Sequence, residues 1–92
     1  MMSQVVWDAR ARSDMRAIIG YIAPRNAKAA QSLKTVIESS AERLPAFPYL
    51  HRVGRTPGTR EAVVHPNYIL VYAVQTDAIR ILRLLHARQQ YP

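Results

Sequence analysis

The sequence contains no cysteine among its 92 residues. Disulfide bonds, thiolate nucleophiles and cysteine-based zinc sites are therefore all excluded, and the fold must be held together by packing. No stretch of about 18 consecutive apolar residues, the length that a membrane-spanning helix requires, occurs in the chain. The first residues do not form a charged segment followed by a long apolar run, as a signal peptide would. We therefore expect a soluble cytoplasmic protein with no membrane partner.

Acidic residues are also scarce, because six Asp and Glu stand against thirteen Lys and Arg, for a formal net charge of +7. The imbalance is largest from Arg43 onward, where seven basic residues face two acidic ones, compared with six and four before it. The positive field of such a surface attracts acidic partners. Nucleic acid and an acidic protein both fit, and a charged surface that serves only solubility is the alternative.

The length of the chain suits one compact domain and is too short for two, so residues 1–92 are expected to form a single domain. A β-favouring run at residues 4–7 precedes Asp8, whose carboxylate could cap a first helix that Pro24 stops. Asn26 can cap a second helix, which ends at Pro45. Because so short a segment connects them, the two helices should form an antiparallel hairpin. Their apolar stripes are Ala11, Met15, Ile18, Ile19 and Ile22, then Ala30, Leu33, Ile37, Ala41 and Leu44.

Three β-favouring runs separated by short turns fill the second half of the chain, and neighbouring runs should pair antiparallel. The segment between Pro45 and Gly58 is rich in proline and glycine and is predicted to be a loop without regular structure. Regular alternation would place Arg80 and Arg83 on opposite faces of the last strand, so that one of them lies at an edge or a solvent-facing margin. The predicted fold is α+β, in the order β-α-α-β-β-β. The three runs are Glu61 to Val64, Tyr68 to Val74 and Ile79 to Leu85.

The residues that could carry enzyme chemistry show no recognised motif. Each of His51, His65 and His86 could act as a general acid or base, or could be structural or merely exposed. No two histidines have the spacing of metal ligands and the acidic residues are scattered, so we expect no metal and no cofactor. Gly54 and Gly58 precede a predicted strand rather than a helix, which favours a turn over a phosphate-binding loop.

Cationic and aromatic residues gather around the predicted loop and the end of the chain. His86, Arg88 and Tyr91 lie at or after the end of the last predicted strand, Arg52 and Arg55 lie in the predicted loop, and Arg60 stands at the start of a strand. Guanidinium groups bind phosphates and carboxylates, and a tyrosine ring can stack on a base. We expect Arg60 and Arg88 to share one exposed margin of the sheet. The alternative interpretation is a solvated basic surface with a frayed end.

Four stretches of the sequence, taken in order in a short, basic and cysteine-free chain, resemble toxins of the RelE/ParE superfamily. The resemblance covers nearly the whole chain and implies the fold predicted above. It also implies a cognate antitoxin, expected to be acidic and to form a hetero-oligomer with the toxin. The stretches are Val6-Trp7 with Ala9, Ala11 and Asp14 ahead of Ile18, Ile19, Tyr21 and Ile22; Asn26 with Ala29, Ala30 and Leu33; Gly54-Arg55 with Gly58 to Glu61; and Tyr68 to Tyr72 before Leu85 to Gln89.

Two activities are known among proteins of this kind. RelE-like members cut messenger RNA on the ribosome without metal, using lysines, arginines and a tyrosine. By that resemblance Arg60, Arg88 and Tyr91 would form the catalytic set. Ile69 and Ala62, however, occupy positions where RelE-like toxins have an arginine and a lysine.

ParE-like members resemble the chain more closely, in the Gly-Thr-Arg-Glu segment at 58–61, the His-Pro-Asn-Tyr turn at 65–68 and the Leu-His-Ala-Arg-Gln segment at 85–89. Such proteins inhibit DNA gyrase and are not enzymes themselves. We therefore favour a gyrase inhibitor over the RelE-like messenger RNA interferase. The residues expected to bind the target are Arg55, Arg60, His86 and Arg88.

Overall fold

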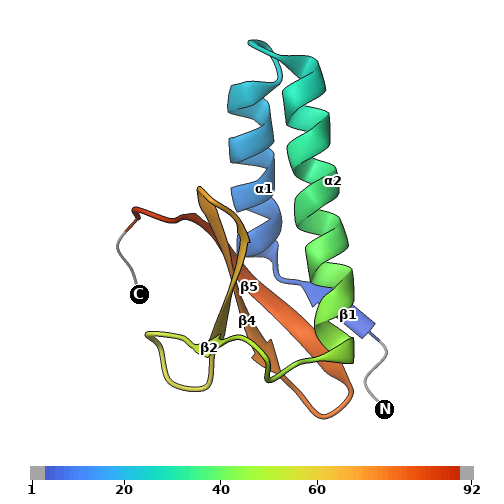
Figure 1. Cartoon of the computed structure of the whole chain (residues 1–92), viewed down its shortest axis with the longest axis vertical. Helices are drawn as coiled ribbons and strands as arrows, with labels where there is room; N and C mark the ends of the chain where they lie inside the picture. The colour runs from blue at the N-terminus through green and yellow to red at the C-terminus, as the bar shows by residue number, and fades with distance from the viewer. Residues whose placement is uncertain (1–3, 90–92) are drawn as a thin grey trace.

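The structure is a computed structural model, and it describes residues 4–89. A helical hairpin covers one side of a β-sheet, as Figure 1 shows, and the predicted α+β class is confirmed. The three predicted runs of the second half are confirmed as strands: the run 68–74 has the expected ends, and the runs 61–64 and 79–85 each extend one residue further at both ends. The elements are β1 (Gln4–Trp7), α1 (Ala9–Ile22), α2 (Ala27–Arg43), a 3-10 turn η1 (Leu44–Ala46), β2 (Arg52–Val53), β3 (Arg60–His65), β4 (Tyr68–Val74) and β5 (Ala78–His86).

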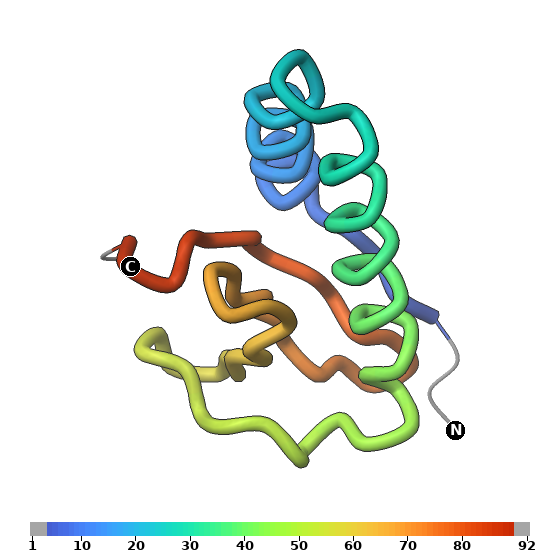
Figure 2. The backbone as a smooth tube through the Cα atoms, turned by 45° about the horizontal axis from the view of Figure 1, so that its top comes forward, coloured from blue at the N-terminus to red at the C-terminus, as the bar shows by residue number. Residues whose placement is uncertain are grey.

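The sheet has five strands in the order β1-β5-β4-β3-β2. β1 pairs parallel with β5, and the other neighbours are antiparallel. The first and last strands, β1 and β5, are therefore neighbours, and β1 and β2 form the two outer edges of the sheet. Figure 2 shows the segment that carries β2 on the side of the sheet away from α1.

The short strand β2 corrects the prediction that the segment before Gly58 lacks regular structure. Arg52 pairs with Glu61 in the strand register, and their side chains form an ion pair of 2.9 Å. The amide of Gly54 donates to the carbonyl of Thr59 at 2.8 Å and closes the hairpin. Gly58 takes a positive φ of 81°, which glycine adopts without strain. Two residues are too few to show an alternating pattern, so the sequence carries no sign of this strand.

The helix boundaries follow the predicted signals with one exception. Asn26 caps α2 as expected, since its side chain accepts a hydrogen bond of 3.0 Å from the amide of Ala29. α1 ends at Ile22, two residues before Pro24. Asp8 occupies the N-cap position of α1, but its side chain caps no amide and instead accepts a bond of 2.7 Å from Arg80. The charged guanidinium of Arg80 is a stronger donor than a neutral backbone amide, and this explains why the Asp8 carboxylate binds Arg80.

The core lies between the hairpin and the sheet. The five predicted stripe residues of α2 and η1 are all buried, whereas in α1 only Ala11 is fully buried and the others pack partly exposed at the rim. α1 packs mainly against β5 and α2, whereas α2 packs against α1 and β3 and continues into η1, which contacts β1 and β5. The sheet contributes Ala62, Leu70, Tyr72, Ile79, Ile81 and Leu84 to this core.

An irregularity in β5 decides where its two arginines point. Val71 pairs with Arg83 and Tyr72 pairs with Ile81, so one residue of β5 is left out of the register. Arg80 and Arg83 then lie opposite Ala73 and Val71, which are two residues apart on β4 and thus on one face of the sheet. The prediction that they occupy opposite faces is wrong for this reason, and a bulge leaves no mark on the composition of a strand.

Both arginines are tied to the beginning of α1. Arg80 pairs with Asp8 at 2.7 Å, and Arg83 pairs with Asp14 at 2.8 Å. Asp14 also accepts a second bond of 3.1 Å from Arg83 and one of 2.9 Å from the amide of Leu84. The hydrogen bond with Asp14 raises the pKa of Arg83, against the effect of burial. The ladder from β1 to β5 ends at Ile81, so Asp14 supplies the acceptor that β1 no longer offers to Leu84.

Candidate interaction surfaces

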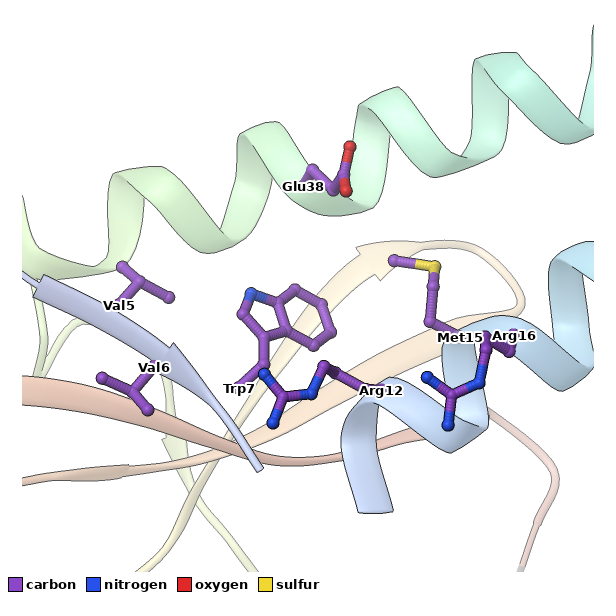
Figure 3. A pocket seen from close by; sticks show the side chains of 7 residues that line it. All are labelled: Val5, Val6, Trp7, Arg12, Met15, Arg16 and Glu38. Carbon is purple, nitrogen blue, oxygen red and sulfur yellow. The ribbon is translucent and has the colours of Figure 1, made fainter. Parts of the chain in front are cut away.

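A groove of about 490 Å³ opens between β1, α1 and α2. Figure 3 shows the Trp7 ring in the middle of this groove, with Met15 of α1 beyond it and Glu38 on the α2 side. Arg12 and Arg16 project from α1 at the rim. Val5 and Val6 of β1 complete the lining, so the floor of the groove is apolar and most of its charged rim is positive.

Two features determine which partner this groove can accept. β1 is an edge strand that pairs on one side only, so the backbone groups on its outer side are open to a further strand. Arg12 and Arg16 are four residues apart and therefore neighbours on the helix surface, where their like charges repel. Neither makes an ion pair with any residue in 4–89. The groove is thus suited to an apolar segment that also carries acidic groups.

The segment between α2 and β3 is fastened to the sheet through its carbonyl groups. The Tyr72 hydroxyl donates to the carbonyl of Pro48 at 2.8 Å. The Arg60 guanidinium donates to the carbonyls of Tyr49 and His51 at 3.3 and 2.8 Å, and it lies 5.0 Å from the centre of the Tyr49 ring. Arg60 is therefore largely engaged in holding this segment.

Glu61 of β3 stabilises the hairpin that joins β2 to β3. Its side chain is almost completely buried, and one carboxylate oxygen accepts a bond of 3.0 Å from Arg52. The other oxygen accepts a bond of 3.3 Å from the amide of Arg55. The buried negative charge is thereby compensated, and the position of Arg55 at the tip of the hairpin follows from Glu61.

Three rings meet at the other end of β4. The rings of His65 and Tyr68 are 5.7 Å apart, and those of Tyr68 and His86 are 5.5 Å apart. The Nδ1 atom of His65 accepts from the amide of Asn67, and that of His86 accepts from the amide of Arg88, both at 3.1 Å. Each neutral imidazole must then carry its proton on Nε2, where it can act as a donor.

The structure divides the predicted target-binding residues into two groups. Arg60 lies opposite Tyr72, and Arg55 belongs to the same end of the sheet. His86 lies opposite Tyr68, with Arg88 just beyond it. The two groups are thus separated by four residues of β4, or roughly 13 Å. The expected common margin for Arg60 and Arg88 is not formed. Tyr91 lies outside the described residues.

Two features of these surfaces were missed in the sequence. Arg12 and Arg16 stand one helical turn apart with no acidic residue at matching spacing on α1, a signal that could have marked the groove beside Trp7. Tyr72 was assigned only to a strand, although a buried tyrosine needs a partner for its hydroxyl. Its partner Pro48 is 24 residues away, so no local pattern could identify it.

The Tyr72→Phe variant should be less stable than the wild type by about 1 kcal/mol at neutral pH, because the Pro48 carbonyl loses its donor. Burial raises the pKa of Tyr72, and the charge of Arg60 opposes that rise. The unfolded chain then loses the phenol proton before the folded one, so this stabilisation is complete below about pH 10 and is lost above it. Urea unfolding of both proteins from pH 7 to 11 would measure the difference. A gap that stays constant with pH would contradict the assignment.

Neither a membrane span nor a metal site is found in the described part of the chain. No helix within residues 4–89 is long and apolar enough to cross a membrane. No three His, Asp or Glu side chains of these residues are grouped so that they could hold a metal ion. The groups that these surfaces present to a partner are apolar side chains, guanidinium groups and the imidazoles of His65 and His86.

Comparison with known proteins gives consistent similarities over nearly the whole chain. Residues 5–91 match the family described as the ParE toxin of the type II toxin-antitoxin system, parDE. Toxin RelE2 of Caulobacter vibrioides is 37% identical over 86 residues, which cover 94% of this chain and 97% of that protein.

Two solved structures share the architecture. One is described as the chromosomal ParDE toxin-antitoxin system of P. aeruginosa, with a TM-score of 0.81 and 21% identity, covering 92% of this chain and 96% of that one. The other is a conserved hypothetical protein of Helicobacter pylori, with a TM-score of 0.63 and 18% identity, covering 98% and 100%. At these identities the structural likeness establishes the fold alone, and it confirms the arrangement predicted from the sequence.

Proposed function

The chain belongs to the ParE toxin family of type II toxin-antitoxin systems, and from this membership we propose that it inhibits DNA gyrase by binding rather than by catalysis. The sequence resemblance to RelE/ParE toxins is confirmed at the level of the superfamily. The choice between gyrase and messenger RNA as the target is the proposal.

The separation of the guanidinium groups is the observation that supports binding over cleavage. Cutting a phosphodiester bond requires cations and a proton acceptor that converge on one phosphate. Arg60 is held by the carbonyls of Tyr49 and His51, and it lies at the opposite end of β4 from Arg88. Ala62 and Ile69, at the positions where RelE-like toxins have cations, are buried.

The cognate antitoxin is the partner that the family implies, and we place it in the groove beside Trp7. An acidic segment of the antitoxin would lay apolar side chains on Val5, Trp7 and Met15 and direct carboxylates to Arg12 and Arg16. The free edge of β1 could in addition accept a strand of the antitoxin. Such a segment orders as it binds, and it neutralises the toxin by covering it.

Purified gyrase provides the test of the proposed function. The wild-type chain should inhibit supercoiling of relaxed plasmid and trap cleaved DNA, and added antitoxin should reverse both effects. A chain that leaves supercoiling unchanged while it fragments messenger RNA in a translating extract would contradict the proposal.

RelE-like cleavage is the second candidate, and the rings at the end of β4 favour it. His65 and His86 flank Tyr68, with Arg88 nearby, so two titratable groups, a phenol and a cation gather at one place. Such a set could exchange protons with a ribose hydroxyl and stabilise a charged phosphate. Fragmentation of messenger RNA that is abolished in His86→Gln would establish this alternative.

A further inference from the structure

Large apolar side chains are exposed along the segment between α2 and β3 and on β3 itself. Five of the seven exposed large apolar residues in the described range 4–89 are found there. Exposed apolar side chains that gather on one part of a small protein mark an interaction site. We call these five residues the loop patch: Phe47 (66% exposed), Tyr49 (64%), Leu50 (74%), Val53 (68%) and Val63 (58%).

The loop patch is hollowed rather than flat. Phe47, Leu50 and Val63 line one hollow of about 240 Å³, whose floor is apolar. Tyr49 and Val53 line a second hollow of about 300 Å³ together with Arg60, Val74 and the Gly58–Thr59 turn. Hollows of this size accept protruding side chains, and such anchoring contributes most of the energy at protein interfaces.

The loop patch is also held in place before any partner arrives. The Tyr72 hydroxyl and the Arg60 guanidinium bind three carbonyls of its backbone, from Pro48 to His51, and Glu61 holds the hairpin that carries Val53. A segment that is already ordered loses little conformational entropy on binding. Buried polar groups of the chain thus hold a segment whose apolar side chains are exposed to solvent. The exposure of these side chains is unfavourable unless a partner covers them.

The charges around the two hollows indicate the chemistry of that partner. Arg43 borders the first hollow and Arg60 the second, and no Asp or Glu lines either of them. Glu61, the acidic residue of the adjoining strand, is buried against Arg52. We propose that the loop patch binds the target protein through a surface on which an apolar side chain projects between carboxylates. Nucleic acid is the poorer match, since a phosphate backbone cannot fill apolar hollows.

The position of the loop patch leaves the Trp7 groove available at the same time. Residues of β1 and α1, with Glu38 of α2, line the groove, and none of them lines either hollow of the loop patch. Figure 2 shows the segment after α2 running along the side away from α1. An antitoxin segment in the groove and a target on the patch would therefore occupy different surfaces. This inference rests on the proposed function, because it assigns the surface that engages the target.

The test combines Leu50→Ser, and Phe47→Ser with Leu50→Ser, with Tyr21→Ser as the control, since Tyr21 is 65% exposed but lies on α1. Gyrase inhibition, growth arrest on induction, antitoxin affinity, RNA binding, molecular mass in solution and thermal unfolding are measured for each protein. We expect both patch variants to lose about tenfold or more in gyrase inhibition and in growth arrest, as loss of an interface anchor does. Antitoxin affinity and unfolding temperature should stay at the wild-type values, and the control should behave as the wild type throughout.

Four results would overturn the inference. The patch variants could arrest growth as the wild type does, or they could lose antitoxin affinity together with growth arrest. They could also lose RNA binding instead of protein binding, or the wild type could be a dimer that the substitutions dissociate. The proposed function fails separately. The wild type could fail to inhibit gyrase while only the patch variants lose growth arrest, with RNA binding and molecular mass in solution unchanged. Gyrase would then be the wrong target, and the loop patch would remain the surface that binds the target. A wild type that causes no growth arrest would overturn both.

Discussion

Reversing the charges of Arg12 and Arg16 together, as Arg12→Glu with Arg16→Glu, should weaken antitoxin binding by about 100-fold. Both arginines stand at the rim of the groove beside Trp7 and have no acidic partner within residues 4–89. Carboxylates of the antitoxin would compensate their mutual repulsion, and glutamates at these positions would repel the same carboxylates. Isothermal titration calorimetry against the antitoxin at low and high salt would measure the effect, and the difference between the proteins should shrink as salt increases.

The matched control is Arg10→Glu with Lys28→Glu. Both residues are exposed, belong to α1 and α2, and lie outside the groove lining, while the net charge changes by the same amount. A local role for the groove predicts a much smaller loss of affinity in this control. Equal losses in the two variants would show that only the overall field attracts the antitoxin, and no loss in either would place the antitoxin elsewhere.

Removing the carboxylate of Asp14 should produce the largest loss of stability among the surface ion pairs. Asp14→Ala deprives Arg83 of two hydrogen bonds and the Leu84 amide of its acceptor. The side chains of Arg83 and Asp14 are only 23% and 18% exposed, so water replaces these bonds poorly. We expect a loss of about 2 to 3 kcal/mol, between the values for exposed and fully buried pairs. For a domain of this size that corresponds to a fall in Tm of about 10 °C or more.

The chain offers its own control for this prediction in Asp8→Ala. The Asp8 and Arg80 side chains are each 36% exposed and are joined by a single bond of 2.7 Å, so the cost should stay below about 1 kcal/mol. In addition, Arg83→Met combined with Asp14→Ala should recover part of the lost stability, because no unpaired guanidinium remains. Equal costs for the two aspartate variants would contradict the larger contribution assigned to Asp14.

The local patterns in the sequence were sufficient for the helices, the main strands and their order. Helical spacing of apolar residues predicted both stripes, and all five residues of the second stripe are buried in α2 and η1. The cap at Asn26 depends on atoms three residues apart, and it was predicted correctly for that reason. The cationic balance, which follows from counting, suggested acidic partners before any geometry was known.

The features that depend on distant partners could not be predicted in this way. Asp8 has the residue type and position of a cap, but Arg80, 72 residues later, takes its carboxylate. The bulge in β5 brings Arg80 and Arg83 to one face, although alternation alone separates them. Arg60 and Arg88, similar in charge and in their predicted role, lie at opposite ends of β4 and have different environments.

Periodicity and capping depend on residues that are close together in the chain, so both can be recognised in the sequence. The sequence by itself therefore determined the α+β class, the helical hairpin and the superfamily. Strand register, the partner of each charged group and the grouping of residues into surfaces arise when segments tens of residues apart compete for the same contacts. Only the tertiary structure decided those, because the free energy of a hydrogen bond or ion pair depends on which donor arrives, at what distance and with how much water excluded. The groove beside Trp7 and the loop patch both belong to this second category.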